Sequence, residues 1–134
     1  MTANKGFILG YTKETVGIYR KGECIIFDDF TMDSKFVNFP FKVKSSAMKI
    51  LTVEAGVDLR FMFEYLQSLD LHSEEHKRHY ISEVETMEVS VPEYKRQQLI
   101  GEMFACIQRK IDNEISIKVA LLRQKSCMLS TMFI

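Results

Sequence analysis

Short apolar stretches separated by polar turns fill the first part of the chain. GFILGYT, ETVGIY and CIIFDDF are rich in branched or aromatic residues, and the polar stretch RKGE separates the last two. Runs of this kind bounded by turn residues are typical of β-strands. We therefore predict a β-rich region over residues 6–30, folded as a hairpin or meander with Arg20–Glu23 at a tip.

KFVNFPFKV, residues 35–43, predicts another strand, although a proline interrupts it. Pro40 has no N–H to donate to a sheet, so we expect it at an edge or a bulge. Phe36 has the opposite parity to Phe39 and Phe41, so in a regular strand only one of these two sets faces outward. MKILTVEAGV, residues 48–57, predicts a further strand.

The apolar residues of VDLRFMFEYLQSL, residues 57–69, follow a helical period. Val57, Phe61 and Tyr65 recur at intervals of four. Asp58 stands near the start, where the positive end of a helix dipole favours an acidic side chain. We therefore predict a helix there.

A second and longer helix is predicted from about Pro92 to Asp112. It follows HYISEVETMEVSV, residues 79–91, whose imperfect alternation and β-branched content favour a strand. Ser90 and Glu93 have capping-box spacing, and Pro92 suits an early helical position. The one-sided apolar stripe of this helix is Leu99, Ile100, Met103, Phe104, Ile107 and Ile111.

The C-terminal residues are again apolar. ISIKVALLR, residues 115–123, predicts a final strand, and an apolar tail follows over about residues 126–134. The tail is tucked into the sheet, docked on a neighbouring subunit or disordered. The predicted fold is a single α+β domain over residues 1–134, with an antiparallel β-sheet and two main helices packed on it.

Composition narrows the possible functions. The chain has 134 residues, enough for one core, and its 18 basic and 18 acidic residues give a formal net charge of zero. Electrostatic binding must therefore come from the distribution of charge, and near-neutrality favours self-association. No secretory signal or membrane-spanning run is recognisable, so any membrane contact would be peripheral.

The sequence contains no recognisable catalytic motif, because GxSxG, the phosphate-binding P-loop and GxGxxG are all absent. The string HSEEHKRH places His72, His76 and His79 on one side of a hypothetical helix, as in helical zinc sites. A solvated loop of mixed charge is the favoured alternative, because no apolar stripe would fix this segment against a core. We therefore expect no enzyme, no catalytic residue, no metal and no cofactor.

Basic residues supply the best candidate contacts. The segment Lys35–Lys49 carries four lysines and no acidic residue. We predict phosphate or lipid-headgroup contacts at Lys42, Lys44, Lys49, Lys77 and Arg78, and membrane or assembly contacts at Phe39 and Phe41. The alternative is a strand with core phenylalanines and lysines that protect its edge from aggregation.

The order of several segments resembles the small matrix proteins of bornaviruses and, more distantly, of rhabdoviruses. The resemblance spans most of residues 1–115. It rests on FVNFPF at residues 36–41, FMFEYLQSLDL at 61–71, KRHYI at 77–81 and QQLIGEMFACIQRKI at 97–111.

This resemblance implies a non-enzymatic structural protein of the virion that self-assembles, often as a tetramer. Such a protein would bind lipid headgroups on the inner face of the viral envelope and would contact single-stranded RNA or the ribonucleoprotein. Its locations would be the virion, the host cell interior and the cytoplasmic face of the membrane. The alternative function is an intracellular protein-docking adaptor or chaperone-like module.

Overall fold

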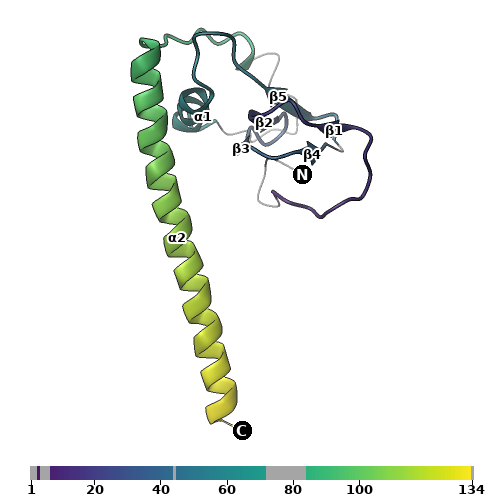
Figure 1. Ribbon diagram of the computed structural model, residues 1–134, viewed down its shortest axis with the longest axis vertical. Coiled ribbons are helices and arrows are strands. Elements are labelled where there is room, and N and C mark those ends of the chain that lie inside the picture. Colours follow the sequence, from purple (N-terminus) through teal and green to yellow (C-terminus); the bar gives the residue numbers. More distant parts are fainter. Residues whose placement is uncertain (1–2, 4–6, 44, 72–83, 134) are drawn as a thin grey trace. The chain divides into compact units, whose positions relative to one another are not determined.

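The computed structural model describes residues 3, 7–43, 45–71 and 84–133. Within these ranges the chain forms strands and helices in the order shown in Figure 1. Their bounds are β1 Ile18–Tyr19, β2 Cys24–Asp28, β3 Ser34–Val37, β4 Phe41–Lys42, β5 Met48–Leu51, α1 Leu59–Ser68 and α2 Tyr94–Met132. The predicted α+β class, with antiparallel strands and two helices, is confirmed. The chain divides into two compact units, residues 1–101 and residues 102–134.

β2 is the centre of a three-stranded antiparallel sheet with the order β3–β2–β5. Ile25 on β2 lies opposite Phe36 on β3 and Leu51 on β5. The first four residues of β2 are all buried, on both faces of the strand. Because successive side chains of a strand point to opposite faces, this sheet must be covered on both sides.

Helix α1 covers one face of the three-stranded sheet. Phe36 shares this face with its cross-strand neighbour Ile25, and its ring meets that of Phe63 on α1 edge-on at 5.9 Å between centroids. The guanidinium of Arg60 lies 3.7 Å from the centre of the Phe36 ring, a cation–π contact. α1 is therefore held to β3 by aromatic contacts, and the Gln67 amide also donates to the Ser34 hydroxyl at 2.7 Å.

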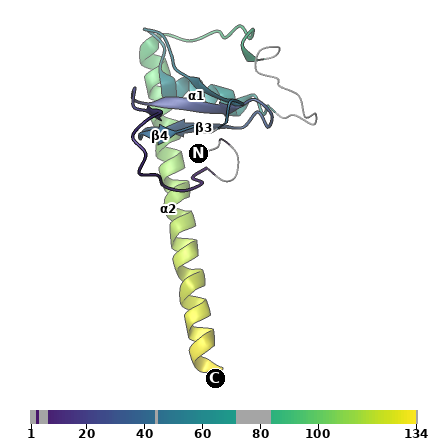
Figure 2. The ribbon, with the colours of Figure 1, turned by 90° about the vertical axis from the view of Figure 1, so that its right-hand side faces the viewer.

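The opposite face of the sheet is covered by β4 and its neighbours, and Figure 2 shows α1 and β4 on different sides. Cys24 and Ile26 of β2 belong to one apolar cluster with Val37 and Phe41. Three partly buried residues complete this cluster: Phe7 from the N-terminal region, Tyr19 from the small sheet formed by β1 and β4, and Val43, which follows β4. Burial of these side chains is the main stabilising term for this layer.

The predicted hairpin between residues 14–19 and 24–30 is wrong. β1 pairs with β4 instead, with Tyr19 opposite Phe41 and their rings 5.2 Å apart. The pattern of apolar residues predicted the strands but could not identify their partners. Residues 7–12, predicted as part of a strand, are not in a strand, and Leu9 and Tyr11 are exposed.

Pro40 lies in the link between β3 and β4, where the chain leaves one sheet and joins the other. Its missing N–H therefore removes no hydrogen bond from either sheet, and Pro40 lies between two strands rather than at the edge or bulge that was expected.

Helix α1 is confirmed, and Asp58 is its N-cap. The Asp58 carboxylate accepts a hydrogen bond from the backbone N–H of Phe61 at 2.8 Å. This contact satisfies one of the N–H groups that a helix start leaves without a helical partner.

The capping box predicted for the second helix is wrong, because α2 begins at Tyr94 and Ser90 lies four residues earlier. Gln97 in its first turn is instead the anchoring residue. Its amide donates to the backbone oxygens of Pro92 at 2.7 Å and Gly56 at 3.3 Å, and accepts from the N–H of Asp58 at 2.9 Å. The start of α2 is thereby fixed to the loop that begins α1.

The predicted C-terminal strand is also wrong, because residues 115–123 belong to α2, which continues through the tail to Met132. Ile115, Ile117 and Val119 alternate as in a strand, but Ile115, Val119 and Leu122 also fit a helical period. The strand predicted at residues 79–91 lies partly outside the described residues, and the described part, from residue 84 on, contains no strand. Among the described residues, neither helix has the length and apolar content required to cross a bilayer.

Candidate binding surfaces

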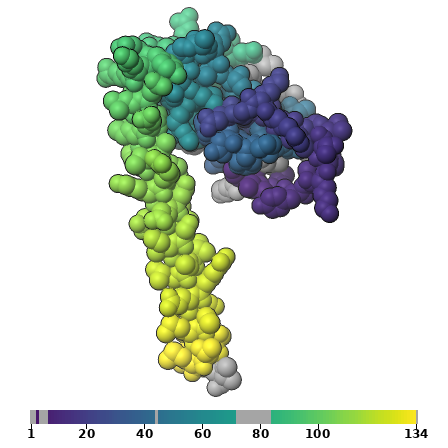
Figure 3. Space-filling model, in the orientation of Figure 1, coloured from purple at the N-terminus to yellow at the C-terminus, as the bar shows by residue number. Residues whose placement is uncertain are grey.

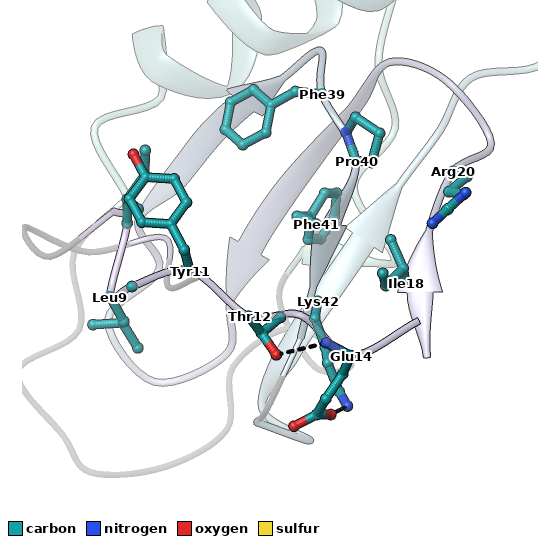
Figure 4. A pocket seen from close by; sticks show the side chains of 12 residues that line it. Leu9, Tyr11, Thr12, Glu14, Ile18, Arg20, Phe39, Pro40, Phe41 and Lys42 are labelled. Carbon is teal, nitrogen blue, oxygen red and sulfur yellow. Dashed lines mark hydrogen bonds and ion pairs between the residues drawn. The ribbon is translucent and has the colours of Figure 1, made fainter. Parts of the chain in front are cut away.

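A hollow of about 730 Å³ lies between the small sheet and the segment that precedes it. β4 and the link before it supply Phe39, Pro40, Phe41 and Lys42, and β1 supplies Ile18 (Figure 4). The other wall is residues 8–12 and Glu14, and Arg20 also borders the hollow. The lining therefore combines apolar and aromatic side chains with two cations and one carboxylate, a mixture common in ligand sites.

Lys42 and Glu14 form an ion pair across this hollow, drawn in Figure 4. The Glu14 backbone N–H also donates to the Thr12 hydroxyl at 3.1 Å, which shapes the turn that carries the carboxylate. Because Lys42 is partly exposed, its attraction to Glu14 is screened by water and is modest. A phosphate group that approached Lys42 would compete with this carboxylate.

The sequence-predicted basic residues fall into two groups. Lys42 lines the hollow, whereas Lys49 lies on β5 opposite Phe27 of β2. Lys44, Lys77 and Arg78 lie outside the described residues, as do His72, His76 and His79. The structure therefore does not bring the predicted cations together into one patch within the part of the chain it describes.

The two predicted aromatic contacts differ in burial. Phe41 is 5% exposed and belongs to the apolar cluster, whereas Phe39 is 38% exposed and borders the hollow. The ring of Phe39 meets that of Phe7 edge-on, with 6.1 Å between centroids. Only Phe39 of this pair therefore presents a large aromatic surface to a ligand.

The described residues contain one buried thiol, Cys24, among their titratable groups. No group of three or more His, Cys, Asp or Glu side chains there is placed to hold a metal ion. Burial raises the pKa of the Cys24 thiol, and a hydrogen bond with the Tyr19 side chain lowers it in part. A thiol with a raised pKa is protonated at neutral pH and is a poor nucleophile, so Cys24 acts as a small core residue.

Helix α2 carries the largest set of exposed apolar side chains. From residue 102 onward, only Ala105 is partly covered among the residues described up to Phe133. Figure 3 shows part of this surface in green to yellow. The large exposed apolar residues from residue 102 onward are Met103, Phe104, Ile107, Ile111, Ile115, Ile117, Val119, Leu121, Leu122, Met128, Leu129, Met132 and Phe133. An apolar surface of this extent is typical of a protein–protein contact.

The sequence does not predict the wall of the hollow formed by residues 8–12 and Glu14, because its apolar runs there are typical of strands. The helix predicted from the sequence ends at Asp112, so more than half of the exposed apolar residues named above lie beyond it. A helical spacing that continues through Ile115, Val119 and Leu122 was the available signal for the longer helix.

The chain is similar to the specificity subunit of the type I restriction enzyme EcoR124I/EcoR124II from Escherichia coli. The two are 44% identical over 98 residues, which covers 69% of this chain. The match covers 24% of the relative, so the chain spans about a quarter of the length of that protein. No family model matches the chain, and no solved structure matches it.

This similarity overturns the resemblance to viral matrix proteins. The matrix assignment rested on the order of segments and on FVNFPF, a string that forms parts of two strands and a link. Short strings of this kind are common in unrelated β-sheets. By contrast, 44% identity over 98 residues requires agreement at many independent positions. The envelope, virion and RNA-binding functions are therefore wrong, and the adaptor or chaperone alternative finds no support.

Proposed function

We propose that the chain serves as part of the specificity subunit of a type I restriction system and takes part in the recognition of duplex DNA. The similarity to the EcoR124I/EcoR124II subunit is the observation that carries this proposal. The chain spans about a quarter of the length of that relative, and the proposal concerns this part only. The proposed partners are DNA and the other subunits of such an enzyme, within a bacterial cell.

The similarity to the EcoR124I/EcoR124II subunit favours residues 1–101, rather than residues 102–134, as the part that contacts DNA. Residues 102–134 number only 33, so most of the matched positions must fall within residues 1–101. The hollow beside β1 and β4 lies in this unit. We therefore assign DNA contact to the hollow and its border, and protein contact to the exposed surface of α2.

Electrostatics favour a local DNA contact. Residues 1–101 carry 13 basic and 15 acidic residues, a formal charge of −2, so this unit has no overall attraction for phosphate. Arg20 and Lys42 supply two cations beside the hollow, and Phe39 supplies a partly exposed ring. Each phosphate contact made by such a cation displaces counterions and makes binding salt-dependent.

The chain itself is proposed to be non-catalytic. A specificity subunit selects a DNA sequence, and selection requires contacts to base edges and to the DNA backbone rather than bond chemistry. Catalysis would then belong to other subunits of the enzyme.

The test is binding of fluorescent duplex DNA to the full chain, alone and mixed with the other subunits of a type I restriction enzyme. We expect binding that weakens as salt is raised, and selection from random duplexes should recover a preferred sequence. Lys42→Glu should weaken binding by about tenfold, because a cation beside phosphate is replaced by an anion. Glu14→Gln should tighten binding, because it removes the carboxylate that competes for Lys42.

Glu23→Gln is the matched control for Glu14→Gln, because Glu23 is an exposed carboxylate that does not line the hollow. It removes the same charge and should change affinity less. Absence of DNA binding both alone and with the other subunits would contradict the proposed function. If all these variants bind DNA equally well, the proposed function stands, but the hollow is not the DNA contact.

A further inference from the structure

The hollow beside β1 and β4 has the size of a small-molecule site. Its volume of about 730 Å³ lies within the range of roughly 300–1,000 Å³ that is usual for ligand pockets. A duplex with all its bases stacked presents groove edges and phosphates at its surface and does not fill such a concavity. A nucleotide drawn out of the stack can place its base inside it. The size of the hollow therefore favours a single nucleotide over a stretch of stacked duplex.

Two cations lie on the face of the β1–β4 pair that borders the hollow. Ile18 on β1 is opposite Lys42 on β4, and both line the hollow. Arg20 lies two residues after Ile18, so it has the same parity, and it also lines the hollow. Such diagonal neighbours in a regular strand pair have Cβ atoms about 7–8 Å apart. The long side chains of Arg20 and Lys42 can therefore reach the same phosphate group.

The fold already places an anion on one of these cations. The Glu14 carboxylate forms an ion pair with the Lys42 ammonium at the border of the hollow (Figure 4). This carboxylate marks a position at which the site accepts a negatively charged oxygen. The side chains are 27% exposed for Lys42 and 62% exposed for Glu14, so water screens their attraction. A phosphate group, which carries more charge and more acceptor oxygens, can therefore replace the carboxylate.

Aromatic rings on the other side of Lys42 suit a base. Phe39 is 38% exposed, and its ring is held by an edge-on contact with the ring of Phe7. Tyr11, on the opposite wall, is 97% exposed. In Figure 4 both labelled rings lie to the left of Lys42, and Arg20 lies to its right. Rings of this kind stack on unpaired bases whatever the base is.

We propose that the hollow binds one unstacked nucleotide, with its base against Phe39 and its phosphate at Lys42 and Arg20. The nucleotide is extruded from duplex DNA or is a free mononucleotide, because both supply the same base and phosphate. The DNA source rests on the proposed function, whereas free mononucleotides test the hollow by itself.

The first experiment detects extrusion. The adenine analogue 2-aminopurine is placed at each position in turn of a duplex, and the duplex is bound to the full chain, alone and with the other subunits of a type I restriction enzyme. Its fluorescence rises when the base leaves the stack, so we expect a rise at one position on binding. A mismatch at that position should tighten binding by about tenfold, because the base is already unpaired.

The second experiment measures binding of free deoxynucleoside 5′-monophosphates to the full chain by calorimetry, with inorganic phosphate as the reference. The monophosphates should bind about tenfold more tightly than phosphate, because only they can stack on a ring. Arg20→Gln should weaken their binding by about fivefold, because it removes one of the two cations. Lys21→Gln changes an exposed neighbour that does not line the hollow and should have little effect.

Phe39→Leu tests the ring in both experiments. It keeps apolar bulk but removes the stacking face, so it should abolish the fluorescence rise and weaken monophosphate binding by about tenfold. Phe30→Leu is the matched control, because Phe30 is 39% exposed but does not line the hollow. It should leave both signals unchanged. Circular dichroism checks that each variant keeps its fold.

The results separate the inference from the proposed function. A fluorescence rise that depends on Phe39 supports extrusion, and monophosphate binding that depends on Phe39 without such a rise supports the free source. If duplex DNA binds but neither signal depends on Phe39, the inference is overturned and the proposed function stands. If monophosphates bind through Phe39 and duplex DNA does not bind, the inference stands and the proposed function fails. If neither ligand binds, both are overturned.

Discussion

Gln97 shows how one side chain can join segments that are distant in sequence. It is 2% exposed, and its amide uses its oxygen and its nitrogen on backbone groups of residues 56, 58 and 92. A buried amide is tolerated in a core only when such partners are present. The sequence offers no sign of this role, because a glutamine near the start of an amphipathic helix is usually solvated.

Replacing Gln97 tests this junction. Gln97→Leu keeps similar bulk but leaves the Asp58 N–H and the Pro92 oxygen without this partner. We expect the free energy of unfolding to fall by about 1–3 kcal/mol, measured by urea denaturation. Gln98→Leu changes an exposed neighbour on the same helix and should alter stability by less than about 0.5 kcal/mol. Equal losses in the two variants would show that the hydrogen bonds of Gln97 are not the cause.

Glu64 provides a pH-dependent test at the same scale. Burial raises the pKa of its carboxyl, and the nearby Arg60 guanidinium lowers it in part. The folded state therefore holds this proton more tightly than the unfolded state, and the corresponding stability is lost as pH rises through the folded pKa. At neutral pH the ionised carboxylate weakens the fold.

Glu64→Gln should accordingly raise the melting temperature at neutral pH. The difference from the wild type should disappear below the ordinary glutamate pKa of 4.5, where both side chains are neutral. Glu54→Gln, at an exposed carboxylate, should show no comparable gain. A Glu64→Gln variant that is less stable at neutral pH would show that attraction to Arg60 outweighs burial.

At the scale of elements, the approach of α2 to α1 depends on Gly101. A Cβ atom built at this residue would lie 3.0 Å from the Asp58 carboxylate oxygen and 3.1 Å from Cγ of Arg60. Asp58 cannot move freely, because the same oxygen caps α1 through the N–H of Phe61. The absence of a side chain at Gly101 therefore permits the close contact.

Gly101→Ala should destabilise the chain, although alanine is favoured over glycine in a helix by about 1 kcal/mol. The steric conflict with the N-cap of α1 opposes that gain, and thermal unfolding measures the balance. Ser116→Ala is the comparison within α2, because Ser116 is exposed, and it should be neutral or stabilising. A Gly101→Ala variant of raised stability would mean that Arg60 and Asp58 can shift at low cost.

Elements with one clear period were predicted correctly, and ambiguous ones were not. Asp58 and the four-residue spacing from Val57 predicted α1 at nearly its observed position. The segment from Ile115 to Val119 fits both a strand and a helix, and the choice depends on the helix that leads into it. Strand partners also depend on tertiary contacts, so the pairing of β1 with β4 could not follow from local pattern.

At the scale of the whole molecule, the formal net charge of zero is the sum of opposite charges on the two units. Residues 102–134 carry five basic and three acidic residues, a charge of +2, which balances −2 on residues 1–101. The contacts predicted from local charge, and the predicted self-association, stay predictions. The sequence could not indicate DNA, because none of the described cations forms a recognisable motif, and the proposal required a homologous protein.

The small sheet has a consequence for any ligand that enters the hollow. β1 and β4 pair through only two residues each, and a strand pair of this size is marginally stable by itself. A ligand that touches both strands and residues 8–14 would hold three weakly fixed segments together. Part of its binding energy would then be spent on ordering the site, so affinity would rise with any substitution that makes the site rigid beforehand.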